Sequence, residues 1–114
     1  KDIPVNNNQP NFIILDKDYV YNKLSKKFNL DNDTSIPFRS VHAVMNYYKK
    51  DRSIVIKLSE SMTNPIIQYE KIESIQRLAA QDMELSIDEM CTYPFKLVDF
   101  RNNELPLSIC YGEE

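Results

Sequence analysis

The chain of 114 residues contains a single glycine, Gly112, close to its C-terminal end. Glycine is the residue that most readily adopts the left-handed backbone conformation that tight turns use. Every interior turn must therefore be made by Asn, Asp, Ser or Pro, through side-chain hydrogen bonds or a fixed φ. The same feature excludes the glycine-rich loops that hold phosphates, so we expect no nucleotide cofactor.

The composition is that of one folded domain, with 42% hydrophobic residues and a net charge of −3. This apolar content excludes wholesale disorder, and no apolar run is long enough to span a membrane, so no membrane contact is expected. Residues 1–11, rich in Asn and Pro, are predicted to form a flexible lead or linker, and residues 12–114 a single α+β domain. The opening Lys1 indicates a processed product or a domain of a longer chain.

Hydrophobic spacing predicts a strand and a helix at the start of this domain. The short apolar run at 12–15 fits a buried strand. A helix capped by Asp16 should follow and end near Leu30, because apolar residues recur every four positions. The polar stretch 31–35 is expected to form a loop.

A second helix is predicted after Pro37. The apolar residues that support it fall at positions i, i+3, i+4 and i+7, the stripe of an amphipathic helix: Val41, Val44, Met45 and Tyr48. Lys49 and Lys50 should end this helix, where cations interact favourably with the helix dipole.

From residue 53 onward, the pattern predicts two hairpins that flank a helix. The expected strands are 54–58, 65–70, 95–100 and 105–111. The helix begins near Lys71, and Ser86 with Glu89 has the form of a capping box. This ββαββ order resembles that of ubiquitin-like β-grasp domains, which implies one small mixed sheet with packed helices, here preceded by a two-helix segment.

Thiol chemistry would have to use Cys91, Cys110 and His42. The cysteines flank the last predicted hairpin, where a cross-strand disulfide is conceivable. Two cysteines are also ordinary for a reduced domain, so we expect free thiols and an intracellular location. A general base must touch its nucleophile, and the helical register places His42 off the apolar stripe. Three Cys and His residues are too few for a structural zinc site, so no metal is expected.

A basic and aromatic surface is the candidate site for a partner. Basic residues gather at the predicted end of the second helix, with tyrosines nearby, and the predicted strand 65–70 offers alternating side chains on a sheet edge. Strand addition at such an edge recognises a partner through main-chain hydrogen bonds. The candidate partner-binding residues are Arg39, Tyr47, Lys49, Lys50, Arg52, Ile66, Gln68 and Glu70.

These patterns favour a non-enzymatic module that binds another protein, with no catalytic residue and no cofactor. An acidic binder of this kind could also act as an inhibitor or immunity-type protein that covers a basic active site. The alternative is a DNA-binding domain, because helix, helix and hairpin in that order resemble a winged helix. The negative net charge makes nucleic acid the less favoured partner. A third hypothesis is a thiol enzyme that uses Cys91 or Cys110. The identity of the partner and the oligomeric state are left open.

Overall fold

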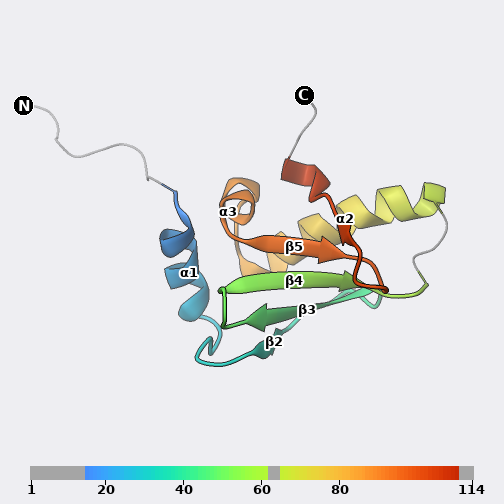
Figure 1. The fold of residues 1–114 in the computed structure, drawn as a ribbon. Coiled ribbons are helices and arrows are strands. Elements are labelled where there is room, and N and C mark those ends of the chain that lie inside the picture. The colour runs from blue at the N-terminus through green and yellow to red at the C-terminus, as the bar shows by residue number, and fades with distance from the viewer. Residues whose placement is uncertain (1–14, 62–64, 111–114) are drawn as a thin grey trace, which may run out of the picture.

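A computed structural model describes residues 15–61 and 65–110 of the chain, and Figure 1 shows their arrangement. These residues form an α+β fold with one five-stranded sheet and three α-helices. The elements in chain order are α1 (Lys17–Ser25), β2 (Thr34–Ile36), β3 (Ala43–Tyr48), β4 (Ser53–Leu58), α2 (Pro65–Met83), α3 (Ile87–Thr92), β5 (Phe95–Val98), β6 (Glu104–Leu105) and the 3-10 turn η1 (Ser108–Cys110). In the part of the chain so described, no helix has the length and apolar character needed to cross a membrane.

The sheet is mixed and its strands lie in sequence order, β2-β3-β4-β5-β6. All neighbouring strands are antiparallel except β4 and β5, which are parallel. A parallel pair needs a long crossover connection, and here α2 and α3 provide it. Figure 1 shows α2 running across one face of the sheet, with α1 at one end.

The core lies between the sheet and α2. In β3, buried residues alternate with more exposed ones, so that Met45 and Tyr47 point inward. Met45 is paired with Ile56, and Ile56 with Leu97, which places a row of buried apolar side chains across the three central strands. Ile75, Ala79, Ala80 and Met83 of α2 belong to the same apolar cluster.

Helix α1 begins where the sequence predicts. The side chain of Asp16 accepts a hydrogen bond from the Tyr19 N–H (2.8 Å), which caps the helix. Val20 and Leu24 are fully buried. The predicted end near Leu30 is wrong, because the helix stops at Ser25 and Leu30 enters the core from the following loop.

The second predicted helix is wrong, because residues 43–48 form strand β3. Its side chains follow a period of two, with Met45 buried while Val44 and Tyr48 are exposed. Pairing with β2 on one side and β4 on the other satisfies the backbone, and valine and tyrosine favour strands. The preceding polar loop is also shorter than expected, since Thr34–Ile36 forms β2. The winged-helix alternative therefore lacks its second helix.

The predicted strand 65–70 is also wrong, because these residues form the first turns of α2. The order from residue 53 is therefore β4-α2-α3-β5-β6, and the ββαββ order of a β-grasp domain is not found. The helical period from Lys71 is confirmed. The last strand is reduced to Glu104–Leu105, and the chain then turns through η1. The lead 1–11 lies outside the described residues, as does the strand predicted at 12–15 apart from Leu15, which is not in a strand.

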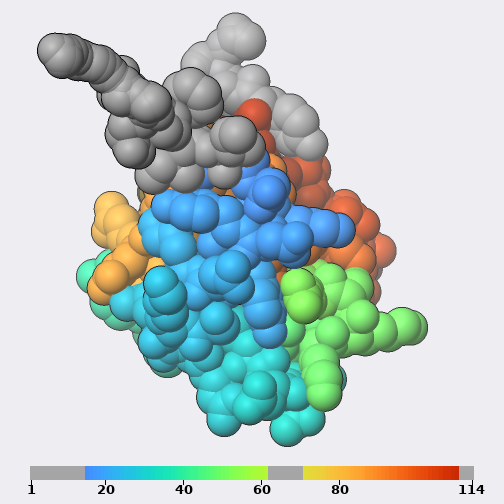
Figure 2. Space-filling view, turned by 90° about the vertical axis from the view of Figure 1, so that its left-hand side faces the viewer, coloured from blue at the N-terminus to red at the C-terminus, as the bar shows by residue number. Residues whose placement is uncertain are grey.

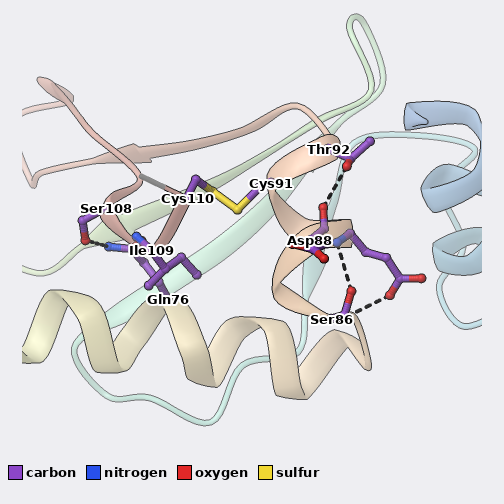
Figure 3. Close-up of a disulfide and its surroundings, with 9 residues drawn as sticks. Gln76, Ser86, Asp88, Cys91, Thr92, Ser108, Ile109 and Cys110 are labelled. Carbon is purple, nitrogen blue, oxygen red and sulfur yellow. Dashed lines mark hydrogen bonds between the residues drawn. A yellow bond between two sulfur atoms is a disulfide. The ribbon is translucent and has the colours of Figure 1, made fainter. Parts of the chain in front are cut away.

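The capping box of α3 is confirmed. The Ser86 hydroxyl accepts from the Glu89 N–H (3.0 Å), and the Glu89 carboxylate accepts from the Ser86 N–H (2.8 Å). Two otherwise unsatisfied backbone donors at the start of the helix are thereby paired. Figure 3 shows these bonds beside the disulfide.

The expectation of free thiols is wrong, because Cys91 and Cys110 form a disulfide with their Cα atoms 5.5 Å apart. The bond joins α3 to η1 and not two strands of a hairpin. Beside it, the Gln76 side chain donates to the Ser108 hydroxyl and accepts from the Ile109 N–H, each at 3.1 Å (Figure 3). The C-terminal segment is thus attached to both α2 and α3.

Candidate partner-binding site

The β3–β4 turn brings three of the candidate basic residues together: Lys49, Lys50 and Arg52. The Lys49 N–H donates to the Asp33 carboxylate (2.8 Å), which attaches the turn to the start of β2. Asp51 accepts from both the N–H and the hydroxyl of Ser53, at 3.2 and 2.7 Å. These hydrogen bonds from Ser53 lower the pKa of Asp51, so its carboxylate is ionised at neutral pH.

Arg52 is held in place on both its backbone and its side chain. Its φ of 60° lies in the left-handed region, which costs a non-glycine residue about 1–2 kcal/mol. Its guanidinium lies 4.2 Å from the centroid of the Tyr21 ring, a cation–π contact, and Nη1 is 3.4 Å from the Asp18 carboxylate. The guanidinium therefore has a defined position although its side chain is 54% exposed.

A cavity of about 320 Å³ lies between this turn, the start of α1 and the junction of α3 with β5. Figure 2 shows this side of the molecule, with α1 in blue beside the turn in green. Four basic side chains contribute to its lining and outweigh two acidic ones. The lining residues are Lys17, Asp18, Lys49, Lys50, Asp51, Arg52, Tyr93 and Pro94.

Two buried tyrosines support the site from within. Burial, together with a hydrogen bond to Tyr21, raises the pKa of Tyr47 to about 12. Burial also raises the pKa of Tyr93, whose hydroxyl has no hydrogen-bond partner among the described residues. Both phenols are therefore neutral at physiological pH. Tyr47 is 1% exposed, so this candidate residue supports the turn and does not itself contact a partner.

The other candidate residues lie elsewhere. The Arg39 N–H donates to the Asp82 carboxylate (3.0 Å), and Arg39 Nε donates to the same group, so Arg39 attaches the segment before β3 to α2. Ile66, Gln68 and Glu70 lie in α2 and not in an edge strand, and the positions of their side chains are outside the description.

The residues considered for catalysis are not brought together. His42 Nε2 lies 3.3 Å from Lys71 Nζ, beside a cavity of about 260 Å³ to which Ser40 and Ser74 contribute. Both sulfur atoms are in the disulfide, so the thiol-enzyme hypothesis has no thiol in this state of the chain. Among the residues whose side chains the structure describes, no group of three or more His, Cys, Asp or Glu is placed to hold a metal ion.

Sequence reasoning missed the parts of the site that lie far away in the chain. Lys17, Asp18 and Tyr21 come from α1, and Tyr93 from the end of α3. Their spacing from the turn follows no local period, so only the packing of α1 and α3 against the sheet reveals them. The available signal was compositional, namely seven tyrosines in a chain of this length.

The arrangement can hold an anion or an acidic side chain at the surface, through cationic groups of which one is fixed by stacking. Searches of protein-family models, of curated proteins and of solved structures find no match for this chain.

Proposed function

We propose that this protein is a non-enzymatic binding module that contacts an acidic surface of another protein. The contact is made through Lys17, Lys49, Lys50 and Arg52, which we call the basic turn surface. The observation that carries the proposal is Arg52, a large cation kept at a left-handed position that suits glycine or asparagine better. Unfavourable backbone conformations are enriched at functional sites, and at Arg52 the conformation coincides with a guanidinium that Tyr21 and Asp18 hold in place.

The edge strand β2 lies next to the basic turn surface, as the bond between Lys49 and Asp33 shows. β2 has only three residues and is followed by Pro37, features that limit strand addition. We therefore assign recognition mainly to side chains of the basic turn surface. Main-chain hydrogen bonds to β2 add to it only over this short length.

The non-enzymatic part of the proposal is supported by the state of the reactive side chains. The disulfide removes both thiolates as nucleophiles, since only the free thiolate attacks. Among the described side chains, His42 lies against the amine of Lys71, and none of them is an acidic group that would orient it as a base.

Charge reversal tests the proposal. The protein captures its partners from an extract of its source, and the variant K49E/K50E is compared with the control K26E/R77E. The control changes the charge equally at two exposed residues, one directly after α1 and one in α2. We expect a partner that is recovered with the wild type and the control and lost with K49E/K50E. Its recovery should also decrease as salt is raised, because exposed charges are screened.

Two results would contradict the proposal. One is equal recovery of all partners by both variants. The other is steep, salt-dependent binding of labelled duplex DNA by the wild type, which would favour the DNA-binding alternative.

A further inference from the structure

Three large apolar side chains are exposed in the described part of the chain, and all of them lie in β3 or just before it. Val41 is 86% exposed, Val44 55% and Tyr48 40%. These are three of the four residues whose spacing suggests an amphipathic helix. Val44 and Tyr48 project from the same face of β3, with Asn46 between them, and Val41 lies in the bend before the strand.

Val44 and Tyr48 lie on the face of the sheet opposite to the core. The strand register places Val44 beside Lys57 and Lys57 beside Val98, while Val55 lies beside Lys96. None of the described helices covers this face, since α2 packs on the other one (Figure 1). We call it the open sheet face, and its residues are Ser35, Val44, Asn46, Tyr48, Ser53, Val55, Lys57, Lys96, Val98 and, in the edge strand, Glu104.

The open sheet face ends in a hollow of about 360 Å³ at the start of β3. Val41, Val44 and Phe100 provide its apolar walls, and Lys57 lies beside them. Contiguous exposed apolar surface is uncommon on proteins that act alone and marks sites of association.

On the three central strands, the charged residues of this face are all basic. Strands β3, β4 and β5 contain two charged residues, Lys57 and Lys96, and both lie on the open sheet face. The edge strand β6 adds the acidic Glu104, which is paired with Val98 and lies at the margin of the same face.

This charge pattern favours an acidic binding partner over a second copy of the chain. A symmetric pairing of two open sheet faces would bring Lys57 and Lys96 of both copies into one interface, and this accumulation of like charge is unfavourable. An acidic partner gains from the same charges. A sheet buries its faces most readily against helices, and this sheet has a helix layer on one side only.

We infer that the open sheet face binds an acidic amphipathic helix of another protein. The apolar stripe of that helix packs on Val44 and Val55, and acidic residues beside the stripe pair with Lys57 and Lys96. The helix forms a second helical layer on the sheet. This site uses none of the residues of the basic turn surface, so the inference goes beyond the proposed function.

Two synthetic helical peptides test the inference. Each has about 18 residues, or five turns, and the same leucine stripe; one has glutamates beside the stripe and the other lysines. We expect the acidic peptide to shift the backbone amide resonances of β3, β4 and β5 in an NMR titration, and the basic peptide to leave them unchanged.

Variants locate the contact. K57E/K96E and V44S, at surface positions of the sheet, should each weaken binding of the acidic peptide by at least about tenfold, or about 1.4 kcal/mol. K49E/K50E should bind it as the wild type does, which separates this site from the basic turn surface.

Several results would overturn the inference. Equal binding of both peptides would show nonspecific apolar contact, and no binding of either would remove the site. Wild-type affinity of K57E/K96E would place the contact elsewhere. A dimer of the wild type in sedimentation, abolished by V44S, would show that a second copy covers the face.

Discussion

At the scale of single residues, the scarcity of glycine has a visible cost. Within residues 15–61 and 65–110, three residues that are not glycine have a positive φ: Arg52 at 60°, Glu84 at 59° and Asn102 at 68°. Asparagine tolerates this region well, whereas arginine and glutamate do not. Arg52 and Glu84 therefore mark positions where glycine would relieve the backbone.

Glu84 terminates α2 at such a position. The Glu84 N–H donates to the Gln81 carbonyl (3.0 Å) and the Leu85 N–H to the Ala80 carbonyl (2.9 Å), the pattern in which glycine is most common. We predict that Glu84→Gly raises the free energy of unfolding by about 1 kcal/mol. The ion pair with Lys27 that it removes is exposed and contributes less. Urea denaturation measures the change, and Glu84→Ala, which keeps the unfavourable φ, should show no gain. A less stable glycine variant would contradict the prediction.

Substitution of Arg52 should abolish partner binding without lowering the stability of the fold. Arg52→Gly relieves the backbone by about 1–2 kcal/mol and loses a cation–π contact of about 0.5–1 kcal/mol. We therefore expect its free energy of unfolding to be unchanged or slightly higher, while capture of the partner is lost. Arg52→Lys keeps the charge without the planar group and should retain part of the binding. Normal capture by Arg52→Gly would remove the observation on which the proposed function rests.

At the scale of elements, one carboxylate connects two helices. Glu89 is 8% exposed, and both its oxygens accept from Lys23 Nζ, at 3.0 and 2.8 Å. Burial raises the pKa of Glu89, but the bonds from Lys23 and from the Ser86 N–H outweigh it and leave the pKa below its ordinary value of 4.5. The same group thus caps α3 and holds α1 against it.

This pKa shift predicts a pH dependence. A lowered folded-state pKa means that the contribution of Glu89 is complete above the ordinary value of 4.5 and is lost as pH falls through the folded value. We expect the free energy of unfolding of the wild type to decrease over that acidic range. The free energy of unfolding of Glu89→Gln should decrease less over the same range. At neutral pH, Glu89→Gln should be less stable by about 1–3 kcal/mol. Urea denaturation at several pH values tests this, with the exposed Glu60→Gln as the control. An equal acid loss in wild type and Glu89→Gln would contradict the assignment.

At the scale of the whole molecule, the last segment is attached at two points that lie close together. Gln76 is fully buried, and its amide holds Ser108 and Ile109, while the disulfide joins Cys91 to Cys110 (Figure 3). Disulfides of this kind are typical of oxidising compartments. The expectation of an intracellular location depended on free thiols. Because both cysteines are in the disulfide, that expectation has no support.

Breaking either attachment should destabilise the fold. The disulfide closes a loop with a sequence separation of 19, which corresponds to about 3 kcal/mol of loop-closure entropy. We predict that reductant lowers the free energy of unfolding of the wild type by about this amount and leaves C91S/C110S unchanged. If reductant left the free energy of unfolding of the wild type unchanged, the disulfide would not restrict the unfolded chain.

Substitution of Gln76 tests the second attachment, which consists of the hydrogen bonds of its amide with Ser108 and Ile109. Gln76→Leu leaves the Ile109 N–H without its acceptor, at a cost of about 1–3 kcal/mol. We expect this loss in denaturation experiments, and faster hydrogen exchange of the Ile109 amide. Gln76→Glu, which keeps an acceptor, should preserve the protection of that amide. Unchanged exchange in Gln76→Leu would show that the segment is held by the disulfide alone.

Local signals in the sequence were sufficient to predict several of the helices and strands. The Asp16 cap, the box of Ser86 with Glu89, the period of two in β4 and the helix from Lys71 were all readable in the chain. The adjacency of Lys49, Lys50 and Arg52 also followed from sequence, because these residues are close together in either a helix end or a turn.

The remaining features depend on tertiary structure, because a local sequence pattern does not indicate which strand or helix packs against a segment. Val44 and Tyr48 belong to the spacing of a buried helical stripe, but pairing of β3 with β2 and β4 makes this segment a strand and leaves those two side chains exposed. The surroundings of Arg52 were likewise beyond sequence reasoning, since Tyr21 lies in another element. Strand pairing and helix packing bring together residues that are distant in the chain, and these contacts determine both proposed surfaces.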